Sequence, residues 1–204
     1  MKKGRLIVIS GPSGVGKGTV VKGLMNQDPN VKLSVSATTR GIRPSETHGV
    51  QYYFISKEEF EKKIDEGAFL EHAVYANNYY GTPEAPADRM LEEGFDVVLE
   101  IEVQGGLQIM EKRPDAISIF IAAPSFEALE ARLLGRGDTA EDLIQRRLRI
   151  AREEYLVAPR YQYVVINDVV EDAVHDVAAI LRADALRASR QKDVLNMDTE
   201  KETE

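Results

Sequence analysis

A glycine-rich turn between an apolar run and a helical stretch constrains this chain more than any other feature. The run Leu6–Ser10 has the unbroken apolar character of a strand buried on both faces. Residues 11–18 follow it and read Gly-Pro-Ser-Gly-Val-Gly-Lys-Gly, and a helical pattern begins near Lys17. In such a turn, backbone N–H groups and the helix N-terminus point at one anion. The segment therefore predicts a phosphate-binding loop (P-loop) at the end of a buried strand.

Lys17 is the residue of this loop that we expect to act in catalysis, because its ammonium group reaches the outer phosphates of ATP. The strict motif places Ser or Thr directly after the lysine as a ligand of Mg²⁺, whereas here Gly18 stands there and Thr19 follows. We therefore expect Mg²⁺ to bind with ATP, mainly through phosphates and water, and assign it no direct protein ligand. A turn that merely joins a strand to a helix is the alternative. The loop residues expected to bind ATP are Gly11, Pro12, Ser13, Gly14, Val15, Gly16, Lys17, Gly18 and Thr19.

Three later apolar runs, at residues 96–102, 117–122 and 163–167, resemble the first and are separated by helical stretches. This alternation predicts an α/β fold of the P-loop NTPase type, with three layers and a parallel central sheet. A long alanine-rich helix from residue 170 to about residue 190 is expected to close it.

The section from residue 34 to residue 82 has a different character. Short runs at residues 33–37, 51–55 and 69–74 are broken by glycine and proline and surround one helical stretch at 57–66. They predict a small, mixed α+β insertion with antiparallel pieces. Helix starts carry capping patterns, Ser56 with Glu59 and Thr139 with Asp142.

The predicted organisation is one domain with two insertions and a polar tail. The domain covers residues 1–190, with a core of 1–33, 83–125 and 157–190, an acceptor-binding insertion at 34–82, a helical lid at 126–156, and a disordered tail at 191–204.

Composition excludes several classes of function. The net charge of −8 argues against a binder of nucleic acid polymers, which needs basic surface. The chain has no cysteine and only three histidines, at positions 48, 72 and 175, so a thiolate nucleophile or a zinc site is not expected. No apolar run is long enough for a membrane span, and we expect a cytoplasmic protein, monomeric or weakly self-associating.

A second polar cluster suits a phosphomonoester. Arg40 and Arg43 stand three residues apart among hydroxyl residues, and Tyr52 and Tyr80 add two more donors. Guanidinium groups bind phosphate oxygens through paired N–H donors, so the cluster predicts a pocket for the acceptor's phosphate. A solvated turn with incidental charges is the alternative.

From residue 5 to about residue 190 the chain resembles the bacterial guanylate kinases, and several segments carry this resemblance in the family's order. They are residues 9–17 (ISGPSGVGK), 36–40 (SATTR) with Arg43 and Glu46, 49–53 (GVQYY), 69–72 (FLEH), 78–82 (NYYGT), 99–105 (LEIEVQG), 135–137 (GRG) and 166–168 (IND). The Gly-Lys-Gly-Thr variant of the P-loop is also familiar in nucleoside monophosphate kinases.

The resemblance implies that GMP is the acceptor. Within it, two arginines and two tyrosines hold the phosphate, while Ser36, Glu71 and Thr82 read guanine. A carboxylate accepts the N1–H and N2–H donors of guanine, and adenine, which lacks N1–H, would leave it unpaired. Glu102 is left with two possible roles, a contact to GMP or one through magnesium-bound water. The implied GMP-binding residues are Ser36, Arg40, Arg43, Glu46, Tyr52, Glu71, Tyr80, Thr82, Glu100 and Glu102.

The helical lid carries three further arginines that the resemblance implies for catalysis, Arg132, Arg136 and Arg147. Helical spacing places Arg147 beside the apolar stripe of its helix, whereas Arg146 and Arg149 point away. Arginines on a closing lid neutralise the moving phosphoryl group and exclude water. The resemblance also implies that Asn167 lies near the adenine of ATP.

The expected reaction is direct transfer of a phosphoryl group from ATP to GMP, and to dGMP as well, with Arg43 acting on the acceptor phosphate. Two rival functions stay open at this point. One is a kinase for another small phosphorylated acceptor such as AMP. The other is a non-catalytic guanylate-kinase-like module that binds phosphopeptides, although such modules typically lose the phosphate loop.

Overall fold

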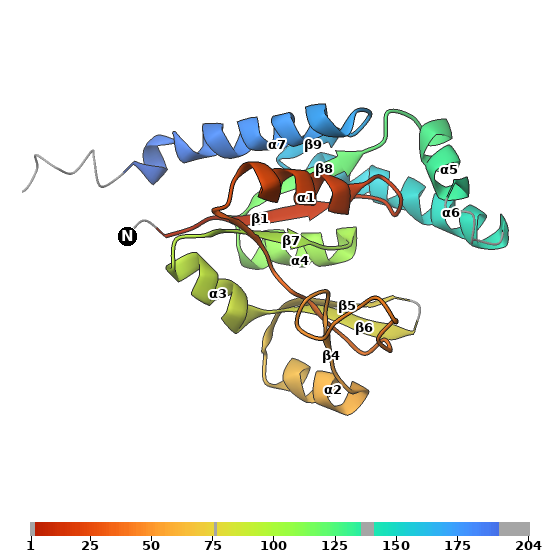
Figure 1. Cartoon of the computed structure of the whole chain (residues 1–204), viewed down its shortest axis with the longest axis horizontal. Helices are drawn as coiled ribbons and strands as arrows, with labels where there is room; N and C mark the ends of the chain where they lie inside the picture. The colour runs from red at the N-terminus through yellow and green to blue at the C-terminus, as the bar shows by residue number, and fades with distance from the viewer. Residues whose placement is uncertain (1–2, 76, 136–140, 192–204) are drawn as a thin grey trace, which may run out of the picture.

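The computed structural model describes residues 3–75, 77–135 and 141–191 and has a parallel central sheet between two helical layers, with a smaller sheet beside it (Figure 1). The central strands run in the order β2-β7-β1-β8-β9, and all neighbouring pairs are parallel. Their bounds are Val31–Leu33 (β2), Asp96–Glu100 (β7), Leu6–Ser10 (β1), Ile117–Ala122 (β8) and Tyr163–Ile166 (β9). The α/β class expected from the strand–helix alternation is confirmed.

The two faces of the sheet bury alternate residues of β1. Ile7 and Ile9 belong to the cluster that includes α1 (Lys17–Gln27) and α7 (Val170–Ala185). Leu6 and Val8 belong to the cluster that includes α3 (Glu84–Glu92) and α4 (Val103–Lys112). A strand buried on both faces explains why this segment is apolar throughout.

The smaller sheet has the order β4-β3-β6-β5, with one parallel and two antiparallel pairings. Its strands are Tyr53–Phe54 (β4), Ala37–Thr38 (β3), Asn78–Pro83 (β6) and Phe69–Tyr75 (β5), and α2 (Lys57–Asp65) packs on it. Phe60 of α2 is fully buried and stacks on Phe69, with ring centroids 4.4 Å apart. Ser56 caps α2 as expected, accepting a hydrogen bond of 3.1 Å from the Glu59 N–H.

Two helices project beyond the central sheet at the end near the P-loop, α5 (Phe126–Leu134) and α6 (Glu141–Val157) (Figure 1). Ile144, Leu148 and Ala151 of α6 are buried, which confirms the predicted stripe. The short helices η1 (Ala158–Arg160) and η2 (Ala188–Arg190) complete the described elements. The predicted cap Thr139 lies outside the described residues.

Several sequence-based boundaries were wrong. Residues 33–37 do not form one run, since β2 pairs with β7 in the central sheet and β3 lies in the smaller one. The last central strand is an edge strand and is not buried on both faces, since Val164 and Ile166, which share one face of the sheet, are more than half exposed. Helix α7 ends at Ala185, before the expected residue 190. Gln191, assigned to a disordered tail, donates a hydrogen bond of 2.7 Å to the Ala185 carbonyl, and residues 192–204 lie outside the described part.

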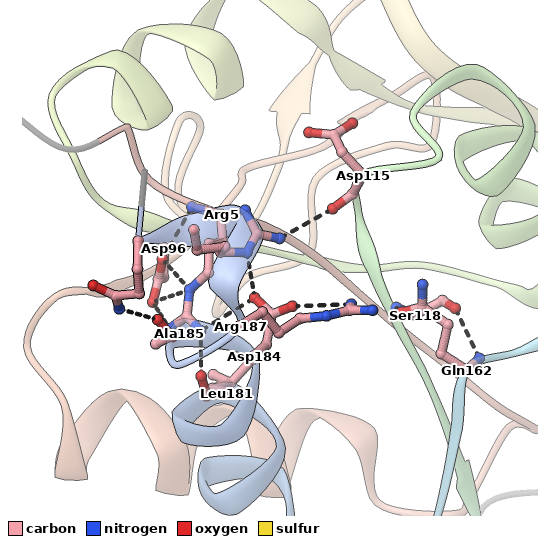
Figure 2. A network of polar contacts seen from close by, with 11 residues as sticks. Arg5, Asp96, Asp115, Ser118, Gln162, Leu181, Asp184, Ala185 and Arg187 are labelled. Carbon is pink, nitrogen blue, oxygen red and sulfur yellow. Dashed lines mark hydrogen bonds and ion pairs between the residues drawn. The ribbon is translucent and has the colours of Figure 1, made fainter. Parts of the chain in front are cut away.

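A buried ionic network joins the start of β1 to the end of α7 (Figure 2). The Arg5 guanidinium lies 2.5 Å from Asp96 and 3.5 Å from Asp184, and it also donates to the Leu181 carbonyl. Asp184 is only 2% exposed and lies 2.6 Å from Arg190.

Among the helices that the structure describes, none has the length and apolarity needed to cross a membrane.

Candidate active site

The P-loop wraps tightly between β1 and α1. Gly14 and Gly16 both have φ of 91°, a left-handed conformation that side chains disfavour. At Gly11, a Cβ atom would lie 2.2 Å from the Ile121 carbonyl oxygen of β8. The Lys17 ammonium group donates to the carbonyls of Gly11 and Pro12, at 2.5 and 3.3 Å. The Lys17 side chain therefore lies against the backbone of the P-loop.

Asn167 and Arg132 support this loop from outside the motif. The Asn167 side chain is 2% exposed and donates a hydrogen bond of 2.7 Å to the Val15 carbonyl. Arg132, from the end of α5, donates to the same carbonyl at 3.5 Å and to the Asp168 carbonyl at 3.4 Å. The contact of Asn167 with Val15 ties the residue that follows β9 to the phosphate loop, and the expected place of Asn167 near the adenine of ATP stays a prediction.

Two cavities meet at the carboxyl ends of β7 and β1. The first, of about 590 Å³, is lined by the P-loop, by the first turn of α1, and by Glu100 and Glu102. The second, of about 210 Å³, is lined by residues of the smaller sheet and by the same two glutamates. Parallel sheets place their ligands at this edge. Glu100 and Glu102 therefore stand between a phosphate-loop cavity and a second cavity.

Glu100 faces the position where the strict P-loop motif has a hydroxyl residue. A Cβ atom at Gly18 would lie 3.3 Å from one Glu100 carboxylate oxygen and 3.4 Å from the other. Burial raises the pKa of Glu100, Lys17 lowers it, and Glu102 raises it further. Gly18 leaves room for a carboxylate at the mouth of the loop.

At one end of the second cavity, Tyr52 and Tyr80 lie beside Arg40, a predicted phosphate-binding residue. Arg40 donates two hydrogen bonds to Glu46, at 2.7 and 2.9 Å, and its guanidinium lies 5.5 Å from the centre of the Tyr52 ring. The Tyr52 and Tyr80 rings are 5.9 Å apart and edge-on, and both line the cavity. The Arg43 side chain is exposed, while its N–H donates to Glu46 at 2.9 Å. Glu46 thus contacts both predicted phosphate-binding arginines.

The other end of this cavity includes Ser36 and Glu71, and Thr82 lies beside Glu71 without lining the cavity. Glu71 is 4% exposed and accepts a hydrogen bond of 2.7 Å from the Thr82 hydroxyl, which is fully buried. Burial raises the pKa of Glu71, while hydrogen bonds from Thr82 and the charge of Lys112 lower it. Ser36 and Glu71 both line the cavity. A carboxylate and a hydroxyl residue here can pair with the donor and acceptor edge of a base.

The predicted lid arginines are placed unequally. Arg147 is half-buried, and its Nε atom is buried without a hydrogen-bond partner in the part of the chain that the structure describes. Arg146 and Arg149 are exposed, as the helical spacing predicted. Arg136 lies outside the described residues.

Known proteins that are similar to this chain in sequence identify its family. The family model described as guanylate kinase matches residues 3–184. The chain belongs to the guanylate kinase family. It is 49% identical to the guanylate kinase of Caldanaerobacter subterraneus subsp. tengcongensis over 193 residues, which is 95% of this chain and 94% of that one. It is 48% identical to the guanylate kinase of Clostridium tetani over 200 residues, 98% of this chain and 96% of that one.

A solved structure supports the same family membership. The crystal structure of guanylate kinase from Anaplasma phagocytophilum matches with a TM-score of 0.79 and 32% sequence identity. The match covers 97% of this chain and 96% of that one. The similarity to members of the guanylate kinase family thus extends over the central sheet, the smaller sheet and the helices α5 and α6.

One carboxylate close to this site, Glu154 of α6, was not predicted from the sequence. It shares a cavity of about 330 Å³ with Glu102, on the side of α4. Burial raises the pKa of Glu154 to about 7, the Glu102 charge adds to this effect, and Lys17 opposes it. Glu154 lies three residues after Ala151, which is buried in the apolar stripe of α6. Residues three apart lie close together on a helix, so this spacing was the feature of the sequence that could have pointed to Glu154.

Proposed function

We propose that the chain transfers the γ-phosphoryl group of ATP to the phosphate of GMP or dGMP, giving ADP and the nucleoside diphosphate for guanine nucleotide recycling. One observation carries the proposal. The phosphate-loop cavity and the cavity lined by Tyr52, Tyr80 and Glu71 share two lining residues, Glu100 and Glu102. A donor phosphate and an acceptor phosphate bound in these cavities would face each other across the two glutamates.

The proposed chemistry is direct in-line transfer without a covalent intermediate. Such a reaction needs its two oxygens held in line, its charge neutralised and water excluded. Lys17 would bind the donor phosphates, while Arg40 and Arg43 would bind the acceptor phosphate. We assign neutralisation of the moving group to the lid arginines Arg132, Arg136 and Arg147.

Base selection is assigned to the buried end of the acceptor cavity. Glu71 would accept the N1–H and N2–H of guanine, and Ser36 and Thr82 would serve the rest of its edge. A base without N1–H would leave a buried carboxylate unpaired, which is a strong form of rejection. This chemistry favours GMP over AMP as the acceptor.

The oxygen donors at the mouth of the P-loop suit a magnesium ion that arrives with ATP. Glu100 is a carboxylate directed at Gly18, and Mg²⁺ prefers oxygen ligands while retaining several waters. Glu100 and Glu102 would hold the hydrated ion, which supplies charge neutralisation at the β- and γ-phosphates.

The deciding experiment is an assay of ADP release with ATP, Mg²⁺ and GMP, dGMP, AMP or UMP as separate acceptors. We expect turnover with GMP and dGMP. Turnover with AMP or UMP instead would overturn the acceptor assignment. Folded, ATP-binding protein without turnover would favour the phosphopeptide-binding module.

A single variant tests the acceptor pocket within this assay. Arg43→Met should raise the KM for GMP roughly tenfold or more, because it removes a charged hydrogen-bonding partner of the phosphate. The KM for ATP should stay nearly constant. Equal changes in both constants would count against the pocket.

A further inference from the structure

We propose that Gly105, in the first turn of α4, is a positioning residue for base selection, because its missing side chain provides the space in which the Glu71 carboxylate lies. The inference rests on the proposed function and deepens it. It assigns a role in guanine recognition to a residue that would touch Glu71 and not the base. Gly105 belongs to a helix that packs on the central sheet, whereas Glu71 belongs to the smaller sheet.

The contact between Gly105 and Glu71 leaves no room for a methyl group. A Cβ atom at position 105 would lie 2.4 Å from Glu71 Oε2 and 3.0 Å from its Cδ atom. Real Cβ atoms do not approach oxygen so closely, so either the helix or the carboxylate would have to move. Glu71 is 4% exposed and lines the second cavity, so a displaced carboxylate would move into the space that the base is proposed to occupy.

The backbone does not require glycine at this position. Gly105 lies inside α4 and outside the left-handed region, in contrast to Gly14 and Gly16 of the P-loop. Glycine in a helix interior is less favourable than alanine. Glycine at position 105 therefore weakens the helix locally, and the space beside Glu71 is the feature that it provides.

The carboxylate is held from two sides at once. Thr82 of β6 donates to Oε1 at 2.7 Å, while Oε2 lies against Gly105 of α4. Glu71 and Thr82 are paired residues of neighbouring strands, so the sheet fixes one side of the carboxylate. Helix α4 fixes the other side, and the orientation of Glu71 toward the base depends on both.

The same helix end favours the ionised form that guanine recognition needs. Glu102 is the N-cap of α4 and makes no side-chain capping hydrogen bond, and first-turn N–H groups lack partners within a helix. A carboxylate beside such an end is stabilised as an anion. This field acts in the same direction as Thr82 and Lys112, which lower the pKa of Glu71 against the effect of burial.

The test compares Gly105→Ala with its neighbour Gly106→Ala in the full chain. Both glycines are buried in the same helix, but a Cβ at position 106 would meet Tyr161 Oη at 2.3 Å and Ser10 Oγ at 2.6 Å, away from Glu71. Gly105→Ala should raise the KM for GMP about tenfold, leave the KM for ATP within about twofold, and reduce the preference for GMP over AMP. Gly106→Ala should lower the melting temperature without changing the ratio of the two KM values.

A double-mutant cycle separates positioning from general damage to the helix. In a Glu71→Ala background, Gly105→Ala should cause no further rise in the KM for GMP, because the group that it displaces is gone. An equal rise in both backgrounds, or equal effects on GMP and ATP, would overturn the proposal.

Folding and function are checked separately. If Gly105→Ala alone does not fold, the Glu71→Ala/Gly105→Ala protein should recover the melting temperature of Glu71→Ala, and failure to recover would overturn the assigned contact. If the unmodified chain does not phosphorylate GMP, the proposed function fails, and this inference fails with it. Normal GMP turnover with an unaffected Gly105→Ala protein would overturn this inference alone.

Discussion

The Glu46 carboxylate accepts two hydrogen bonds from the Arg40 guanidinium, at 2.7 and 2.9 Å, and the same residue accepts the Arg43 N–H at 2.9 Å. One side chain therefore holds the Arg40 guanidinium and the Arg43 backbone of the proposed acceptor phosphate site. The hydrogen bond from Arg40 is the main cause that lowers the pKa of Glu46. Since a carboxylate repels phosphate, Glu46 is better suited to hold Arg40 than to touch the ligand.

Glu46→Gln should therefore weaken GMP binding without affecting ATP. The amide offers one acceptor oxygen in place of two, so the paired contact with Arg40 is lost. We expect the KM for GMP to rise about three- to tenfold, the effect of one charged hydrogen bond. Glu66→Gln, at an exposed i,i+4 pair on α2, is the matched control. A Glu46→Gln protein with the GMP affinity of this control would contradict the role.

Lys17→Ala should remove most turnover and leave the fold intact. The lysine contacts only loop carbonyls among its hydrogen-bond partners in the described structure, so its loss creates no buried cavity. Loss of an electrostatic group that acts on the moving phosphate costs roughly a hundredfold or more in kcat. Circular dichroism and kcat would be measured on the same protein. The control is Lys22→Ala, because Lys22 is exposed and lines the phosphate-loop cavity. Near-normal kcat for Lys17→Ala would refute the donor-site assignment.

The parts of the site that are contiguous in sequence were predictable. Residues 11–16 form the expected loop between β1 and α1, and α1 begins at Lys17 as expected, because a strand, a glycine turn and a helix start are local features. The orientation of Arg147 was predicted for the same reason, since one helix's periodicity decides which side chains face inward.

The parts that depend on distant pairing were not predictable in this way. The position of β2 beside β7 and the edge position of β9 follow from the sheet order, which local patterns do not encode. The contact of Asn167 with Val15 spans 152 residues, and the space at Gly105 is filled by Glu71 from the other sheet. Such contacts emerge only when separate elements pack.

Ionisation of Glu154 should make the free energy of unfolding depend on pH between about 4.5 and 7. Its pKa is raised from 4.5 to about 7, mainly by burial and then by Glu102, so the folded state binds this proton more tightly than the unfolded state. The resulting stabilisation is complete below pH 4.5 and is lost as the pH rises through about 7. Glu154→Gln, which cannot ionise, should escape this loss.

Melting temperatures at pH 5 and pH 8 test this dependence. The melting temperature of Glu154→Gln, compared with that of the unmodified protein at the same pH, should be higher at pH 8 than at pH 5. Glu153→Gln, at the exposed neighbouring position, should show no such change. The same difference between Glu154→Gln and the unmodified protein at both pH values would rule out a raised pKa at this residue.

Asp184→Ala should destabilise the fold strongly while sparing the proposed substrate sites. Asp184 lies within 3.5 Å of Arg5 and Arg187 and 2.6 Å of Arg190, so its loss leaves Arg5 with one carboxylate partner, Asp96 (Figure 2). Breaking a buried ion pair by removing one partner costs about 3–5 kcal/mol. Urea unfolding would measure the cost, with Asp176→Ala, exposed on the same helix, as the control. Because the network lies at the amino end of β1, opposite the P-loop, both KM values should persist, and a selective change in one of them would contradict a purely stabilising role.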